Sequence, residues 1–328
     1  MSQTNDVVVS ICCLAYNHEK YIEQCLEGFL RQRTTFGYEI IIHDDASTDR
    51  TTEIIRQYQK KYPDVIKPIY QTTNQHDLGK NLCQIYREFI YPKVTGKYIA
   101  YCEGDDFWRA EDKLEKQVDV LEKNPQCHMC LHRVRCVSES GELQSSTYPG
   151  TELKQGVIPS RSFLRGLSDG NFFHTSSFLC RKEDVLKSVD PMPEYYKLSY
   201  SEDVPLLLFF GFLGDNYYIE DEMSCYRRNS IGSWSEGQKD NTEKVVASKE
   251  EIIRLYQSYD EYTGFIYSDI CKHWINSEKV RIAEINRDYV ELCRPQYHEF
   301  LKDRSFTFKL RCRVMAGFQR IFSKGFRG

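Results

Sequence analysis

Residues 98–106 read Tyr-Ile-Ala-Tyr-Cys-Glu-Gly-Asp-Asp, an apolar run that leads directly into three carboxylates. The same design occurs upstream, where Tyr-Glu-Ile-Ile-Ile-His at 38–43 leads into Asp-Asp-Ala-Ser-Thr-Asp at 44–49. An apolar run of about four to eight residues that ends in turn-forming residues is typical of a buried strand. The sequence therefore predicts two buried strands, each of which ends in acidic side chains.

The flanking segments predict how these strands are connected. Val7 to Leu14 is a third apolar run of strand length, and the apolar positions from Tyr21 to Leu30 share one face of a helix. Asn17 and Ser47 are the residues that we expect to cap the two helices. Strands that alternate with helices predict an α/β fold with a mostly parallel sheet flanked by helices. In such sheets ligands bind beyond the carboxyl ends of the strands, where both acidic clusters fall.

The acidic clusters limit the nucleotide chemistry that this edge could support. No Gly-x-Gly-x-x-Gly follows the first strand and no P-loop is present, so dinucleotide binding and P-loop hydrolysis are disfavoured. Carboxylates can hold a diphosphate only through a divalent cation, and hard oxygen ligands suit Mg²⁺ or Mn²⁺. The alternative for Glu103 to Asp106, taken alone, is an acidic surface turn.

Three motifs together resemble the family-two glycosyltransferases. They are Val-Ser-Ile-x4-Tyr-Asn at 9–17, Ile-Ile-His-Asp-Asp-Ala-Ser-Thr-Asp at 41–49 and the stretch at 98–106. The resemblance spans roughly residues 7 to 235 and implies the GT-A fold, a Rossmann-type sheet. It also implies a metal-dependent, inverting enzyme that takes a nucleoside-diphosphate sugar, most often a UDP-sugar. The implied acceptor is a saccharide or lipid-linked glycan in capsule, O-antigen or exopolysaccharide assembly.

The resemblance also implies roles for single residues on the donor side. Tyr16 would stack near the base, Asp45 would accept from the base or ribose, and Asp44 would support their loop. Asp105 would contact the ribose, and Asp106 would ligate Mn²⁺ or Mg²⁺. A second set of residues follows later in the chain: Arg227 or Arg228 on phosphate oxygens, and Trp234 closing over the sugar. Packing is the alternative for Trp234.

The general base is the other residue that the resemblance implies. Glu202 and Asp203 precede the apolar run 204–213, where the family keeps this group, and Asp203 would be the base, with Glu202 on the acceptor side. The alternative is that both acids only complement the dipole of a helix N-terminus. His174 resembles a wall of the acceptor pocket, with a structural histidine as the alternative. One base without a carboxylate nucleophile implies inversion.

Two regions with different charge divide the chain. We expect a catalytic domain over residues 1–240, with nucleotide-sugar binding in 1–110 and the acceptor side in 111–240, then a helical extension over 241–328. The whole chain carries −4 and its last 25 residues carry +7, so residues 1–303 carry −11. Leu310, Val314, Phe318, Ile321 and Phe322 can share one face of this basic end. That pattern predicts either a helix on an anionic membrane surface or one docked on the protein.

Composition excludes several other classes. With 44 basic and 48 acidic residues, a dedicated nucleic-acid binder is disfavoured. No apolar stretch is long enough to span a membrane and no secretory signal is present, which predicts a cytoplasmic protein. A zinc site at Cys127 to Cys136 is disfavoured because the segment alternates as a strand. Two rival functions remain: a sugar nucleotidyltransferase, and a non-catalytic nucleotide- or carbohydrate-binding module of the same fold.

Overall fold

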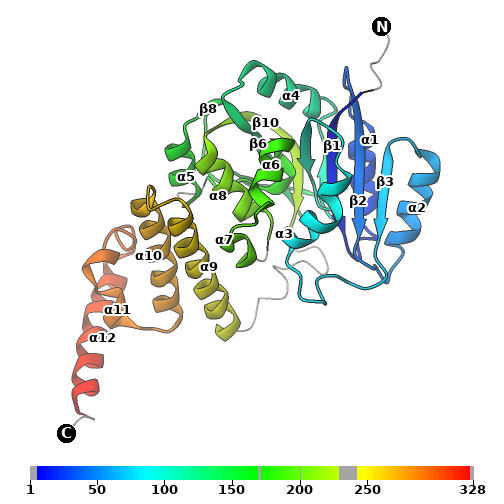
Figure 1. The fold of residues 1–328 in the computed structure, drawn as a ribbon. Coiled ribbons are helices and arrows are strands. Elements are labelled where there is room, and N and C mark those ends of the chain that lie inside the picture. Colours follow the sequence, from blue (N-terminus) through cyan, green and yellow to red (C-terminus); the bar gives the residue numbers. More distant parts are fainter. Residues whose placement is uncertain (1–5, 169–170, 200, 229–241, 326–328) are drawn as a thin grey trace. The chain divides into compact units, whose positions relative to one another are not determined.

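The chain forms two compact units, Met1–Gly237 and Gln238–Gly328, which are described separately. The structure is a computed structural model that describes residues 6–168, 171–199, 201–228 and 242–325 (Figure 1). The first unit is built on one mixed sheet, whose described strands are β1 (Val7–Ala15), β2 (Gly37–Asp44), β3 (Ile66–Tyr70), β4 (Tyr98–Tyr101), β5 (Phe107–Trp108), β6 (Cys127–Val137), β7 (Leu143–Tyr148), β8 (Gly156–Ile158), β9 (Leu179–Arg181) and β10 (Asp215–Arg227).

The sheet order is β3-β2-β1-β4-β9-β6-β10-β5, with β7 beside β6 and β8 beside β10. Strands β3, β2, β1 and β4 are all parallel, as predicted. Strand β9 runs antiparallel to both β4 and β6, and β10 returns parallel to β6. The sheet therefore has one parallel half, β3-β2-β1-β4, and one half with mixed strand directions. The predicted α/β class is confirmed.

The helices of the first unit cover both faces of this sheet (Figure 1). On one face, the apolar side chains of α1, α2 and α4 pack on alternate residues of β1 such as Ile11 and Cys13. The opposite face of β1 is turned toward Tyr86 and Tyr101, because Cys12 points to that side. The helical segments are α1 (Ile22–Leu30), α2 (Thr51–Lys61), α3 (Leu82–Ile85), η1 (Tyr86–Ile90), η2 (Tyr91–Lys93), α4 (Lys113–Lys123), α5 (Ser160–Ser168), η3 (Thr175–Ser177), α6 (Lys182–Val189), α7 (Glu194–Lys197) and α8 (Asp203–Leu213).

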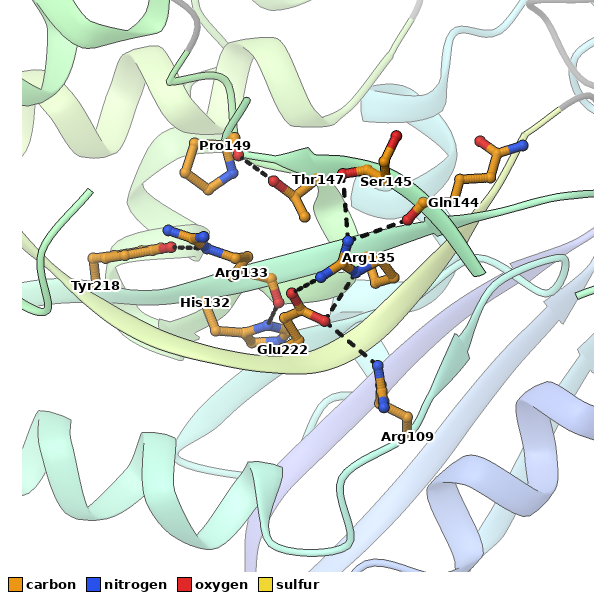
Figure 2. A network of polar contacts seen from close by, with 10 residues as sticks. All are labelled: Arg109, His132, Arg133, Arg135, Gln144, Ser145, Thr147, Pro149, Tyr218 and Glu222. Carbon is orange, nitrogen blue, oxygen red and sulfur yellow. Dashed lines mark hydrogen bonds and ion pairs between the residues drawn. The ribbon is translucent and has the colours of Figure 1, made fainter. Parts of the chain in front are cut away.

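A polar network ties the second half of the sheet together (Figure 2). Glu222 on β10 accepts from Arg135 on β6, and it also pairs with Arg109 at 3.5 Å. Arg135 Nη1 donates in addition to the carbonyls of Gln144 at 3.1 Å and Ser145 at 3.3 Å, which joins β7 to β6. The network lies where the β6–β10 register shifts on both sides of Glu222, so ion pairs hold the ladder where backbone pairing is irregular.

The segment Cys127 to Cys136, where the sequence disfavours a zinc site, forms a strand, as predicted. Its side chains are buried more completely than an alternating pattern of buried and exposed residues implies. In β6, Cys127, Met129, Cys130, Leu131 and His132 are all buried. Every cysteine has a free thiol, and the described residues contain no cluster of three or more His, Cys, Asp or Glu arranged for a metal. Helices α4 and α8 and the segment η3 all pack against this strand, which explains why residues on both of its faces are buried.

The second unit is helical and has its own core. Trp274 packs between Tyr256 and Tyr259, with ring centroids 5.0 Å and 6.1 Å away. A second cluster joins the last helices through Tyr289, Leu292 and Cys312. The described segments of this unit are α9 (Thr242–Tyr262), α10 (Ser268–Ile285), α11 (Tyr289–Leu292), η4 (Pro295–Tyr297) and α12 (Phe306–Gly325). None of the helices in the described parts of the chain is long and apolar enough to cross a membrane.

Candidate active site

Backbone register brings the two acidic clusters to the same edge of the sheet. The ladder pairs Ala15 with Asp44, and beyond it the Asp45 N–H donates to the Ala15 carbonyl at 3.0 Å. On the other side of β1, the Gly104 N–H donates to the Leu14 carbonyl at 2.8 Å. The end of β1 is therefore flanked by both clusters, which is the arrangement that parallel strands predict.

Asn17 and Ser47 do not cap helices, contrary to prediction. Helix α1 begins at Ile22 and α2 at Thr51, and neither has a side-chain N-cap bond. Instead the Asn17 N–H donates to Ser47 Oγ at 3.0 Å, and the Asn17 side-chain oxygen accepts from the Thr48 N–H at 2.8 Å. Asn17 has a φ of 55°, a left-handed conformation that asparagine tolerates. The two residues hold the loops after β1 and β2 together.

Asp44 and Asp45 have different surroundings. Asp44 is 1% exposed and accepts from Thr52 Oγ1 and from the Ser47 N–H at 3.1 Å, so it supports the loop. Asp45 accepts from the Gln75 N–H at 2.8 Å and anchors the segment after β3. Tyr16 follows β1 and is 42% exposed. Gln75, which the motifs did not indicate, therefore lies at this edge beside Asp45.

The turn 103–106 concentrates negative charge in a buried place. Gly104 has no room for a side chain, because a Cβ would lie 2.8 Å from His18 Nδ1. Burial and the charge of Asp105 raise the pKa of Glu103 to about 8 and that of Asp106 well above its usual range. A divalent cation would relieve this repulsion, and carboxylate oxygens are the donors that Mg²⁺ and Mn²⁺ prefer. The turn supplies carboxylate oxygens of the kind that such a cation takes. Because the described residues hold no cluster of three or more ligands, phosphate oxygens and water would have to complete its coordination.

Arg227 binds the acidic turn through its backbone and its side chain. Its N–H donates to Asp106 Oδ1 at 2.8 Å, and its Nε donates to the Asp105 carbonyl at 2.9 Å. The rest of the guanidinium donates to the Glu139 carbonyl at 2.6 Å and to Gln24 Oε1 at 2.7 Å. The side chain is 3% exposed. These contacts give Arg227 a structural role in place of the predicted phosphate contact.

The predicted partner Arg228 lies elsewhere. Its guanidinium carbon lies 5.9 Å from the ring centroid of Tyr148, and the residue is half-buried. Successive residues at the end of a strand point to opposite sides, which explains why these two arginines differ. Trp234, the predicted cover for the sugar, lies outside the described residues.

His174 faces the acidic turn. Its Nε2 lies 3.6 Å from Asp106 Oδ2, while Nδ1 accepts from the Ser176 N–H at 3.3 Å and lies 3.0 Å from Ser176 Oγ. An imidazole that accepts at Nδ1 carries its proton on Nε2. Burial lowers the pKa of His174 to about 4, so the ring is neutral at pH 7. His174 therefore presents an N–H toward the acidic turn, and sequence reasoning alone gave no such orientation.

Glu202 and Asp203 lie at the start of α8 and have different surroundings. Glu202 is 3% exposed and accepts from the Tyr91 hydroxyl, and burial raises its pKa to about 7. We therefore assign Glu202 a supporting role instead of the predicted acceptor contact. Asp203 Oδ1 accepts from the Val204 N–H at 2.7 Å, and burial raises the pKa of Asp203. After burial and the charge of Asp105, the charge of Asp203 also contributes to the raised pKa of Glu103.

The model of glycosyl transferase family 2 matches residues 10–187, more than half of the chain. The protein belongs to this family and is a glycosyltransferase, which confirms the predicted enzyme class. It is 38% identical to EpsE of Bacillus subtilis over 68% of this chain and 76% of EpsE. An uncharacterised protein of Mycobacterium tuberculosis is 33% identical, with 69% of this chain and 60% of that protein covered, so the chain spans about 60% of that relative's length.

Further comparisons extend to a named activity and to solved structures. Poly(ribitol-phosphate) beta-glucosyltransferase of Bacillus spizizenii is 28% identical over 60% of this chain and 31% of that protein. S. aureus TarS 1–349, in complex with UDP-GlcNAc, superposes with a TM-score of 0.62 at 16% identity, covering 90% of this chain and 80% of TarS 1–349. Mannosyltransferase PcManGT of Pyrobaculum calidifontis, with GDP-Man and Mn²⁺, gives 0.54 at 12% identity, covering 97% and 86%. These structures share the GT-A-like fold.

Proposed function

We propose that this glycosyltransferase moves a sugar from a nucleoside diphosphate, with a UDP-sugar as the first choice, to a hydroxyl of a saccharide or lipid-linked acceptor. The observation that carries the proposal is that α8 begins beside the strand that leads into the 103–106 turn. Glu202 accepts from the Tyr91 hydroxyl, and that hydroxyl lies 3.1 Å from Tyr101 Oη in β4. Asp203 is the next residue and the first of α8, and its charge contributes to the raised pKa of Glu103. A base carboxylate and an acidic metal-type turn on one edge suit displacement of a diphosphate.

In this mechanism each group has one task. Asp203 takes the proton from the acceptor hydroxyl as its oxygen attacks the anomeric carbon. Because no second carboxylate is assigned as a nucleophile, attack is direct and the anomeric configuration inverts. Tyr16 and Asp45 orient the nucleoside, whereas Arg228 lies over Tyr148 and is given no phosphate contact. When bound, Mn²⁺ or Mg²⁺ at Asp106 neutralises charge on the departing diphosphate.

Two relatives support this choice of substrates. The TarS structure contains UDP-GlcNAc and the PcManGT structure contains GDP-Man and Mn²⁺, so proteins of this fold hold nucleotide sugars and a divalent ion. The Bacillus spizizenii relative is named as a poly(ribitol-phosphate) beta-glucosyltransferase. We propose a cytoplasmic role in assembling a surface glycan on this basis.

We also propose that α12 lies on the inner, anionic face of the cell membrane. Phe306, Leu310, Val314 and Phe318 form one row along this helix and are 78%, 50%, 48% and 53% exposed. The opposite side of the helix packs into the second unit through Cys312 and Ala316. At about 3.6 residues per turn, Arg311 flanks the row on one side and Lys309 and Arg313 on the other. Apolar residues between cations match an anionic lipid surface.

The donor proposal is tested by binding. A thermal-shift screen of UDP-, GDP- and dTDP-sugars with and without Mn²⁺ should give one nucleotide class that stabilises the protein only with the metal. Calorimetry of that nucleotide then gives its affinity. Stabilisation by no nucleotide sugar, at millimolar ligand with Mn²⁺ present, would contradict the proposed donor.

A further inference from the structure

Four partly exposed rings gather beside the acidic turn, and we call them the ring cluster: Tyr148, Phe172, His174 and Tyr226. The ring centroid of Tyr148 lies 6.4 Å from Phe172, 5.9 Å from His174 and 5.8 Å from Tyr226. His174 and Tyr226 are 4.2 Å apart. The rings come from the end of β7, the segment before η3 and the end of β10. Tertiary packing alone brings them together.

The ring cluster is not part of the core. Phe173, which lies between Phe172 and His174 in the chain, is 1% exposed and stacks on Phe163 at 5.5 Å. The chain thus places one aromatic residue in the core and turns its two neighbours toward the surface. Partly exposed aromatic rings beside the sheet edge that carries the proposed catalytic residues are typical of a place where a ligand packs.

Polar donors stand at the edges of these rings. His174 presents its Nε2–H toward Asp106, and its orientation is fixed by Ser176, whose hydroxyl lies 2.8 Å from Ser224 Oγ. Arg228 lies over Tyr148. A pyranose has a face of C–H groups that packs on aromatic rings and a rim of hydroxyls that accept hydrogen bonds. Its shape and chemistry therefore match the ring cluster.

The position of the cluster separates it from the nucleotide side. In the sheet, β1 and β2, whose ends carry Tyr16 and Asp45, lie on one side of β4. Strands β6, β7 and β10, which position Tyr148 and Tyr226, lie on the other side. The acidic turn follows β4, so it stands between the two. A sugar on the ring cluster would approach that turn from the side away from the nucleoside.

Resting on the proposed glycosyl transfer, we propose that the ring cluster is a stacking subsite for a pyranose ring of the acceptor. Tyr148 and Tyr226 are its specificity-determining residues, and His174 borders the subsite on the side of the acidic turn. The donor sugar has the same chemistry, so the experiment must distinguish the two sources of the ring.

The test is saturation-transfer NMR with methyl glycosides of glucose, galactose, mannose and N-acetylglucosamine, in both anomers, with UDP and Mn²⁺ present. We expect at least one glycoside to receive saturation on one ring face and to lose ~10-fold in affinity in Tyr148→Ala, while Tyr148→Phe retains binding. Tyr226→Leu, a second variant at another strand, should also weaken binding. Tyr262→Ala, an exposed tyrosine of α9, is the matched control and should bind as the wild type does.

Three results would overturn the inference: no glycoside of the panel binds the wild type, Tyr148→Ala binds as well as wild type, or the loss falls on the donor sugar. The last result is measured by calorimetry. The affinity of Tyr148→Ala for UDP and for UDP-GlcNAc should stay within ~2-fold of wild type. A selective ~10-fold loss of affinity for UDP-GlcNAc would instead show that the ring cluster binds the donor sugar. If the wild type binds no nucleotide, the proposed function is contradicted and the subsite is not. In that case glycoside binding measured without nucleotide still tests the subsite.

Discussion

The backbone N–H of Arg227 donates to Oδ1 of Asp106 at 2.8 Å, although 121 residues separate the two in the chain. This bond fixes one oxygen of the carboxylate and leaves Oδ2 on the side of His174. The Arg227 guanidinium also holds the backbone of the same turn at Asp105. One buried arginine at the end of β10 therefore determines the shape of the acidic turn that follows β4.

Replacing Arg227 should destabilise the first unit. Arg227→Met leaves the carbonyls of Asp105 and Glu139 without their donor, and unpaired buried groups of this kind cost about 1–3 kcal/mol each. We expect a loss of about 2–4 kcal/mol in the free energy of unfolding, measured by urea denaturation. Arg109→Met, at a site 41% exposed with one 3.5 Å ion pair, is the control and should change stability by less than about 1 kcal/mol. Equal effects of the two variants would contradict the role given to Arg227.

Asp106 should control metal-dependent donor binding. Asp106→Ala removes the proposed cation ligand, so calorimetry with the preferred nucleotide sugar should show no gain in affinity on adding Mn²⁺. Asp119→Ala removes a carboxylate whose contact is a surface pair with Lys123, and it should keep the gain. Unchanged Mn²⁺-dependent affinity in Asp106→Ala would remove the assigned metal role.

Asp203 should matter for turnover and not for donor affinity. Asp203→Asn preserves the shape of the side chain and its bond to the Val204 N–H, but it cannot accept a proton. We expect turnover to fall by ~10² or more, the scale of a lost general base, with nucleotide binding within about 2-fold of wild type. Near-normal transfer, measured as release of the nucleoside diphosphate with an active acceptor, would exclude Asp203 as the base.

Stability should depend on pH through Lys113. This residue is 0% exposed, its Nζ donates to Gln117 Oε1 at 2.7 Å, and burial lowers its pKa to about 7. An unfolded lysine keeps its proton up to about pH 10, so between about pH 7 and 10 the unfolded state binds more protons. Lys113 should therefore contribute a positive slope to the free energy of unfolding in this window, of up to about 1.4 kcal/mol per pH unit. The raised pKa of Glu103 acts in the opposite direction up to about pH 8, so the slope is read as the difference between the wild type and a variant without Lys113.

The variant Lys113→Met should remove this slope, which urea denaturation at pH 7, 8 and 9 would measure. Lys116→Met is the control, because its pair with Asp221 raises the pKa of Lys116 and places its titration above this window. A difference in the free energy of unfolding between wild type and Lys113→Met that stays constant from pH 7 to 9 would show that Lys113 does not cause the dependence.

The apolar row of α12 should bind anionic membranes. Wild-type protein should co-sediment with vesicles containing phosphatidylserine and remain in solution with pure phosphatidylcholine. Leu310→Ser with Phe318→Ser should abolish co-sedimentation, because it removes two of the exposed apolar contacts, and ~0.5 M salt should weaken it. Leu143→Ser, at a residue 64% exposed in the first unit, is the control. Binding that is unchanged in the double variant would contradict the membrane role.

The sequence by itself determined the class of fold and the edge where the site lies. Apolar runs at 7–14, 38–43 and 98–101 specify buried strands through short-range patterning, and helices between them require parallel pairing. Because parallel strands end at one edge, the acids that follow two of them had to meet there. The same local logic failed for Asn17 and Ser47, because both side chains bond across loops 30 residues apart instead of capping their own helices.

Only the tertiary structure decided how the neighbouring residues of each motif divide their tasks. Arg227 is buried in contact with the acidic turn whereas Arg228 lies over Tyr148. Glu202 is buried and accepts from Tyr91, whereas Asp203 accepts from the Val204 N–H at the start of α8. The ring cluster likewise joins residues from three separate segments. Residue patterns indicate local propensity and which face of a single strand or helix is buried. The burial and hydrogen-bond partners of one side chain depend on segments that are distant in the sequence and pack against it.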